Sequence, residues 1–148
     1  MRLTMRSLMV LLLTSICTLT AQAEQKLIER GYEVHFNAFN SSFVTPEVAA
    51  ANGIVRSKVR ALVNVAVFKL EHDGEKKAVR ANIKGEASNL LQQIQTIEFK
   101  PIIEGDVIYY IGGFRFSEEE RMTIQLEVTP DPNQAPIKVS FNQTFYTE

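Results

Sequence analysis

The residues from position 56 to position 60 give the chain its best candidate for binding an anion. Arg56 and Ser57 are adjacent, and Lys58 and Arg60 follow closely. A guanidinium group beside a hydroxyl can hold a carboxylate or a phosphate through paired hydrogen bonds. The alternative is structural, with Arg56 capping helix carbonyl groups or pairing with Glu47 at the surface. A small anionic ligand bound by Arg56 and Ser57 is therefore one hypothesis.

The sequence contains no motif for metal binding or covalent catalysis. Its two histidines, His35 and His72, have no second histidine, cysteine or close carboxylate pair at ligand spacing. No serine lies in a Gly-x-Ser-x-Gly motif, and the single cysteine, Cys17, lies near the N-terminus. We predict no catalytic residue, no metal and no cofactor, and we expect His35 on a polar or partner-facing strand surface.

An enzyme remains the alternative, because active sites assemble in space from residues that are distant in sequence. A small hydrolase or carbohydrate-active enzyme would need several scattered polar groups to meet in one cleft. The residues available for this are His35, Arg56, Glu104, Asp106 and Tyr109. Their positions relative to a cleft decide between the two classes.

The elements that must position these residues are mostly β-strands, since apolar and polar residues alternate along much of the chain. The alternation predicts seven strands, at residues 32–40, 58–71, 76–84, 96–103, 107–116, 122–128 and 137–146. Asp73-Gly74 and the turn at 104–106 predict hairpins, and Gly112-Gly113 predicts a bulge or bend. This spacing of short strands predicts an antiparallel β-sandwich of immunoglobulin-like type.

One short helix is expected. Thr45 can cap it, Pro46 suits its first position, and Asn52-Gly53 is a typical end. Residues 88–97 are ambiguous, because their apolar residues fit a helix face while their glutamines fit either state. We expect a loop or a single helical turn there, leading into the strand at 96–103.

Two of the predicted strands are apolar on both faces, which is unusual in a sandwich whose outer faces meet water. The outward-facing candidates are Leu62, Phe68, Leu70, Ile108 and Tyr110. Either the short helix and the segment at 88–95 cover them, or they form a surface patch that binds a partner. Asn64 interrupts the same face, so we expect it to be hydrogen-bonded if it is buried.

Residues 1–23 predict a secretory signal peptide. Arg2 and Arg6 precede an apolar run at 8–19 that is too short to span a bilayer, and Ala21-Gln22-Ala23 suits a signal peptidase. Cys17 follows the bulky Ile16, which argues against lipid attachment. We expect cleavage after Ala23, a soluble periplasmic product without a stable membrane anchor, and one mature domain at 24–148.

Without the two leader arginines the chain has 14 basic and 17 acidic residues. A net negative charge argues against nucleic-acid binding. The mature chain also lacks cysteine, so packing must hold it together without disulfides. The sequence leaves the oligomeric state unknown.

Several segments of the mature chain resemble the family known as domain of unknown function 4426, which consists of small exported proteins of Gram-negative bacteria. These segments are residues 32–43, 45–49, 54–57, 61–64, 104–110 and 145–146. The resemblance implies a periplasmic location and a stand-alone domain, and it implies no activity or site residues.

The leading functional hypothesis is a non-enzymatic binding or accessory module that acts through an apolar and aromatic surface. Its partner is a protein or a small anionic ligand. The candidate binding residues are His35, Arg56, Ser57, Phe68, Tyr109 and Tyr110.

Overall fold

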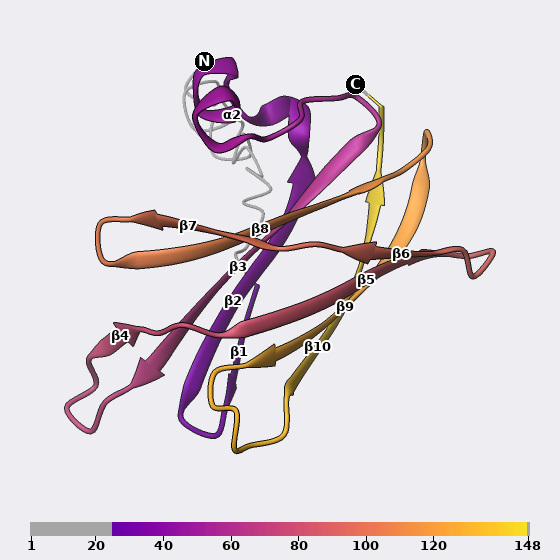
Figure 1. The fold of residues 1–148 in the computed structure, drawn as a ribbon. Helices are drawn as coiled ribbons and strands as arrows, with labels where there is room; N and C mark the ends of the chain where they lie inside the picture. The colour runs from indigo at the N-terminus through magenta and orange to yellow at the C-terminus, as the bar shows by residue number, and fades with distance from the viewer. Residues whose placement is uncertain (1–24, 148) are drawn as a thin grey trace, which may run out of the picture.

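The computed structural model describes residues 25–147, which form two antiparallel β-sheets packed face to face (Figure 1). Sheet A has the strand order β1-β2-β3-β8-β7, with β4 paired to one end of β3. Sheet B has the order β10-β9-β5-β6. This arrangement confirms the immunoglobulin-like β-sandwich. The predicted signal peptide and its cleavage site lie outside the described residues.

The described residues contain ten strands, one 3-10 turn and one α-helix. The elements are β1 Gln25–Glu29, β2 Tyr32–Asn40, η1 Ser41–Phe43, α2 Pro46–Asn52, β3 Arg60–Leu70, β4 Lys76–Ala78, β5 Asn82–Asn89, β6 Ile94–Ile97, β7 Lys100–Glu104, β8 Val107–Arg115, β9 Glu120–Thr129 and β10 Ile137–Phe145. No helix in this part of the chain is long and apolar enough to cross a membrane.

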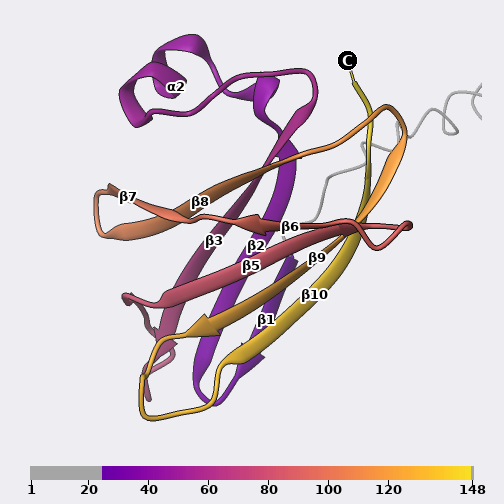
Figure 2. The same ribbon diagram turned by 45° about the vertical axis from the view of Figure 1, so that its right-hand side comes forward.

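The predicted short helix is confirmed at both ends. The Thr45 side chain accepts a hydrogen bond from the Val48 amide, and Pro46 opens the first turn of α2. Gly53 ends the helix with φ 64°, a left-handed conformation that glycine adopts without strain. In both views α2 lies beyond the ends of the strands, so it does not cover a sheet face (Figures 1 and 2).

The prediction of seven strands was wrong in number, because two of the predicted strands change sheet along their length and because β1 was not predicted. The predicted strand at 76–84 is two strands: β4 pairs with β3 in sheet A, and β5 pairs with β9 in sheet B. The Ala81 amide between them donates to the Tyr110 hydroxyl at 2.9 Å. This bond fixes the first crossing to β8 of sheet A.

The predicted strand at 96–103 is also divided. β6 pairs with β5 in sheet B, whereas β7 pairs with β8 in sheet A. At this second crossing Gly112 faces the link, and a Cβ there would lie 2.9 Å from the Glu98 carbonyl oxygen and against the Ile97 side chain. Gly112 is therefore needed for close packing. The predicted bulge at Gly112-Gly113 was wrong, since β3 and β8 pair in continuous register through both residues.

Two further expectations were wrong. No strand was predicted at 25–29, where β1 pairs with β2. It also expected a loop or helical turn at 88–95, but β5 continues to Asn89 and β6 begins at Ile94. Leu90 and Leu91 occupy the exposed tip of this hairpin, so the segment covers no other surface.

The core lies between the sheets and contains the inward-facing half of each alternating strand. Val63, Val65 and Val67 of β3 meet Ile124, Leu126 and Val128 of β9 in one buried cluster. At one corner, Gln143 donates to the Ala38 carbonyl and Asn40 donates to the Tyr146 carbonyl. These bonds tie the end of β10 in sheet B to β2 in sheet A.

Candidate functional site

The side chains of β2, β3 and β8 that point away from the core form an apolar and aromatic surface, which we call the sheet A face. Cross-strand pairing arranges them in rows, of which the central one is His35, Ala66 and Tyr109. The neighbouring rows contain Glu33 with Phe68, Asn37 with Asn64 and Ile111, and Phe39 with Leu62. Leu62 and Ala66 are buried, and Phe68 and Tyr109 are half-buried. The doubly apolar character of β3 therefore produces a continuous patch.

A charged cluster lies at one end of this face. The Glu33 side chain is only 3% exposed, and its Oε1 accepts a hydrogen bond from Lys76 Nζ at 2.6 Å. His35 Nε2 lies 2.5 Å from the same oxygen, and Lys26 Nζ lies 4.0 Å from it. A buried carboxylate needs such partners, since it has lost its hydration.

The Lys76 hydrogen bond lowers the pKa of the Glu33 carboxyl below its ordinary value of 4.5. Burial opposes this shift, while the contact with His35 and the charges of Lys26 and Lys76 favour it. Glu33 is therefore a carboxylate at neutral pH. The His35 ring also stands edge-on to Phe68, with centroids 5.3 Å apart, so the cluster and the aromatic patch are continuous.

Asn64 lies near the middle of the sheet A face and is not satisfied within the described residues. Its Oδ1 atom is buried and has no hydrogen-bond partner there. The expectation that a buried Asn64 would be hydrogen-bonded was wrong for this atom. An orphaned acceptor costs free energy, roughly 1–3 kcal/mol.

Arg56 and Ser57 lie at the α2 end of the sandwich and are already engaged. Arg56 Nε donates to the Val44 carbonyl at 2.7 Å, and its Nη2 donates to the Ser42 carbonyl at 3.2 Å. The Ser57 amide donates to Ser41 Oγ, which in turn donates to the Ser57 carbonyl. These residues hold η1 and the loop around α2 in place, so the role of Arg56 is structural, although its partners are carbonyl groups of residues 42 and 44 and not those of α2 or the Glu47 carboxylate.

Of the remaining candidates, three lie together on the sheet A face and one, Tyr110, is buried. Tyr110 points into the core, where it is 7% exposed and accepts the Ala81 amide, so the structure gives it a role at the first crossing. His35, Phe68 and Tyr109 lie together on the sheet A face. His72 is exposed in the hairpin between β3 and β4.

The residues of the enzyme alternative do not meet in one place. Glu104 ends β7 and Asp106 lies in the exposed turn before β8, whereas Arg56 binds loop carbonyls next to α2. His35 and Tyr109 share a row but are separated by β3, which places their Cα atoms about 10 Å apart. No group of three or more His, Cys, Asp or Glu residues suited to a metal ion occurs within residues 25–147.

Sequence reasoning missed Glu33 as a member of this site. The available signal was its position two residues before His35, which puts both side chains on the same face of β2. Its burial could not be foreseen, because Lys76 reaches it from a strand 43 positions along the chain.

Comparison with known proteins gives one family and a set of similar structures. A family model described as "Domain of unknown function (DUF4426)" matches residues 28–148. No curated protein matches the chain. A crystal structure of a DUF4426 family protein from Pseudomonas aeruginosa is 31% identical, with a TM-score of 0.73 over 86% of this chain and 98% of that one.

Two structures of FetP from uropathogenic Escherichia coli strain F11 share the fold at low identity. FetP expressed in the periplasm of E. coli is 13% identical, with a TM-score of 0.59 over 83% of this chain and 93% of FetP. A copper-bound FetP variant is 14% identical, with a TM-score of 0.57 over 85% of this chain and 92% of that variant. At this identity the likeness concerns the fold.

Proposed function

This chain belongs to the DUF4426 family, and from that premise we propose that it is a non-catalytic binding module of the periplasm that holds a partner protein on its sheet A face. The proposed location is supported by the leader-like sequence at 1–23 and by the fold shared with FetP. The proposed mode of action is supported by the surface of β2, β3 and β8.

The observation that carries the proposal is the aromatic patch on the sheet A face. Phe39, Phe68 and Tyr109 are half-buried residues on the outside of a sheet, next to the buried Leu62 and Ala66. The patch extends over three strands, and neither α2 nor the hairpin at 90–93 covers it. Broad surfaces rich in Phe and Tyr are typical of protein interfaces.

The polar groups of this face add specificity. Asn64 Oδ1 offers a buried acceptor that a donor from a partner can satisfy. The buried carboxylate of Glu33 is already paired with Lys76 and His35, so it presents no unpaired negative charge to a partner. A protein is favoured over a small anion because the guanidinium of Arg56 is bound to loop carbonyls.

Site-specific photocrosslinking tests this proposal. A photoreactive phenylalanine analogue at position 109 should give an adduct with a protein in the periplasm of living cells. The matched control places the analogue at position 91, because Leu91 is 80% exposed and lies in the hairpin between β5 and β6. Phe68→Asp should remove the adduct formed from position 109, whereas Leu91→Asp should leave it intact.

Thermal unfolding separates binding from folding in this experiment. If Phe68→Asp does not fold, Asn64→Asp provides a second variant on the same face. The proposal is wrong if positions 91 and 109 give the same adducts, if no protein is captured at 109, or if a folded Phe68 or Asn64 variant keeps the adduct.

A further inference from the structure

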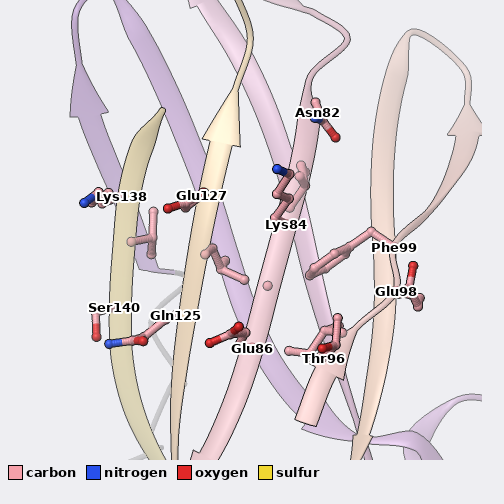
Figure 3. A pocket seen from close by; sticks show the side chains of 15 residues that line it. Asn82, Lys84, Glu86, Thr96, Glu98, Phe99, Gln125, Glu127, Lys138 and Ser140 are labelled. Carbon is pink, nitrogen blue, oxygen red and sulfur yellow. The ribbon is translucent and has the colours of Figure 1, made fainter. Parts of the chain in front are cut away.

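The outer side of sheet B carries a groove that is unrelated to the sheet A face (Figure 3). Its volume is about 680 Å³, within the usual range for small-molecule sites. Nine polar residues from all four strands and from the link after β6 line it. These are Asn82, Lys84, Glu86, Thr96, Glu98, Gln125, Glu127, Lys138 and Ser140.

Strand alternation explains why these side chains gather on one side. Ile83 and Ala87 of β5 pack in or against the core, so Lys84 and Glu86 between them point outward. Register then aligns Lys84 with Glu127 and Lys138 in one row, and Glu86 with Thr96, Gln125 and Ser140 in the next. Figure 3 shows these residues along neighbouring strands around the groove.

The polar side chains of the groove are free of partners in the part of the chain that the structure describes. Lys84, Glu127 and Lys138 are direct cross-strand neighbours, yet no ion pair within 4.0 Å joins them. By contrast, Thr123 donates to Asn142 at 2.6 Å on the same face, just outside the groove. The groove therefore combines a hollow with donors and acceptors that are unpaired within the described residues.

The charges of the groove nearly balance. Lys84 and Lys138 oppose Glu86, Glu98 and Glu127, so the groove gives no strong preference for an anion or a cation. A fitting ligand must satisfy ammonium donors and carboxylate acceptors at once. Hydroxyl groups do this, because each is both a donor and an acceptor.

The position of the groove disfavours a polypeptide strand. Peptides bind sheets by adding to an edge, where backbone groups are unpaired. The polar row of the groove instead includes β9, which is paired on both sides, and its side chains project from the surface of the sheet. Phe99 also lines the groove, but it is half-buried and packs against the core with its ring directed toward β5 (Figure 3).

We propose that this groove binds a neutral oligosaccharide, with Lys84, Glu86, Glu127 and Lys138 hydrogen-bonding its hydroxyl groups. The site is independent of the partner surface on sheet A, because the two lie on opposite outer sides of the sandwich. Either site can therefore be present without the other.

The test is titration of the protein, labelled for NMR, with chitotetraose, maltotetraose and cellotetraose. At least one of them should bind with a dissociation constant of about 1 mM or lower. Binding should shift the backbone amide signals of Lys84, Glu86, Gln125 and Glu127. Glu127→Ala and Lys84→Ala should each weaken binding about tenfold or more, the expected loss for a hydrogen bond to a charged group.

Matched controls use charged residues on the other sheet. Glu104→Ala and Lys100→Ala remove exposed charges from β7 and should leave the affinity unchanged. The proposal is wrong if none of the three saccharides shifts these signals at about 10 mM. It is equally wrong if the groove variants bind as tightly as the unmodified protein, or if a peptide containing Lys and Glu binds the groove and the saccharides do not.

Discussion

The outer faces of the two sheets differ in what their charged side chains contact. On sheet A, Glu33 is buried and bound to Lys76 and His35, next to a patch of aromatic residues. On sheet B, Lys84, Glu127 and Lys138 are aligned by register but form no ion pair within the described residues. Charged groups that are paired with one another stabilise the fold, whereas the unpaired charged groups around the groove remain available to a ligand. Substitution of the paired Glu33 should therefore change stability, whereas substitution of the unpaired groove residues should change binding and leave stability almost unchanged.

The largest effect is expected at Gly112, because β8 of sheet A packs there directly against the link between β6 and β7. Gly112→Ala would place a Cβ against Ile97 and 2.9 Å from the Glu98 carbonyl oxygen, in the link that borders the groove. Overpacking of this kind should lower the free energy of unfolding by about 3 kcal/mol. The melting temperature should then fall by roughly 10 °C.

The neighbouring glycine provides the control for this prediction. A Cβ at Gly113 would meet only the end of the Arg60 side chain among its three nearest contacts, and that group can move. Gly113→Ala should therefore have a much smaller effect on thermal unfolding. Equal melting temperatures for the two variants would contradict the role assigned to Gly112.

The second effect is an acid dependence that originates on sheet A. Because the pKa of Glu33 is lowered by folding, the unfolded chain binds more protons in acid than the folded chain does. The stabilisation from Glu33 is thus complete above its unfolded pKa and is lost as the pH falls through the folded pKa. Glu33→Gln should lower the free energy of unfolding by about 1 kcal/mol at pH 7.

Denaturant unfolding between pH 7 and about pH 3 measures this dependence. The unmodified protein should lose more stability over this range than Glu33→Gln does. The matched control is Glu127→Gln in the groove, which should keep the pH dependence of the unmodified protein. Parallel curves for the unmodified protein and Glu33→Gln would show that Glu33 is not the source of the acid dependence.

The third prediction concerns the orphaned oxygen of Asn64 on sheet A. Asn64→Val removes a buried acceptor without a partner and should raise the free energy of unfolding by about 1 kcal/mol. The same change should weaken the adduct formed at position 109. Denaturant midpoints and crosslinking yields check both results, and a loss of stability would show that Asn64 is satisfied in solution.

The smallest effect is expected in the groove. Glu127→Ala and Lys84→Ala should change the free energy of unfolding by less than about 0.5 kcal/mol, because neither side chain has a partner within the described residues. The positive control is Asn89→Ala, which removes bonds from the Asn89 side chain to Leu91, Gln93 and Glu120. That change should lower the free energy of unfolding by roughly 1 kcal/mol or more. Clear destabilisation by both groove variants would show that these charges serve folding.

Much of the fold is predictable from local patterns. The alternation in β2, β3, β9 and β10 and the capping residues of α2 appear in the sequence and in the structure. The crossings between the sheets cannot be predicted in this way, because alternation indicates which side chains are buried and not which strands are hydrogen-bonded to each other. Val79, Ala81 and Ile83 all pack against the core although the chain changes sheets between them, and Ile97 and Phe99 do the same at the second crossing.

The candidate sites were predictable only in part. The apolar faces of β3 and β8 indicated the sheet A face from sequence, since a strand that is apolar on both sides is unusual in a sandwich. The groove left no such signal. In the sequence, each groove residue fits the solvent-exposed side of an ordinary strand, as Lys84, Glu127 and Lys138 do. Only the register of three strands and the lack of ion pairs distinguish these residues from other exposed charges.

The crossings between the sheets also bear on how the chain reaches its native state. Sheet B is built from β5 and β6 together with β9 and β10, and the intervening β7 and β8 belong to sheet A. Neither sheet is one continuous stretch of chain, and sheet B is completed only by the last two strands, β9 and β10. A nascent chain that stops after β6 lacks the strands that complete both layers. Folding should therefore be a late, concerted event of the millisecond-to-second kind that non-local β pairing produces, and a period of exposure to chaperones and proteases should precede it.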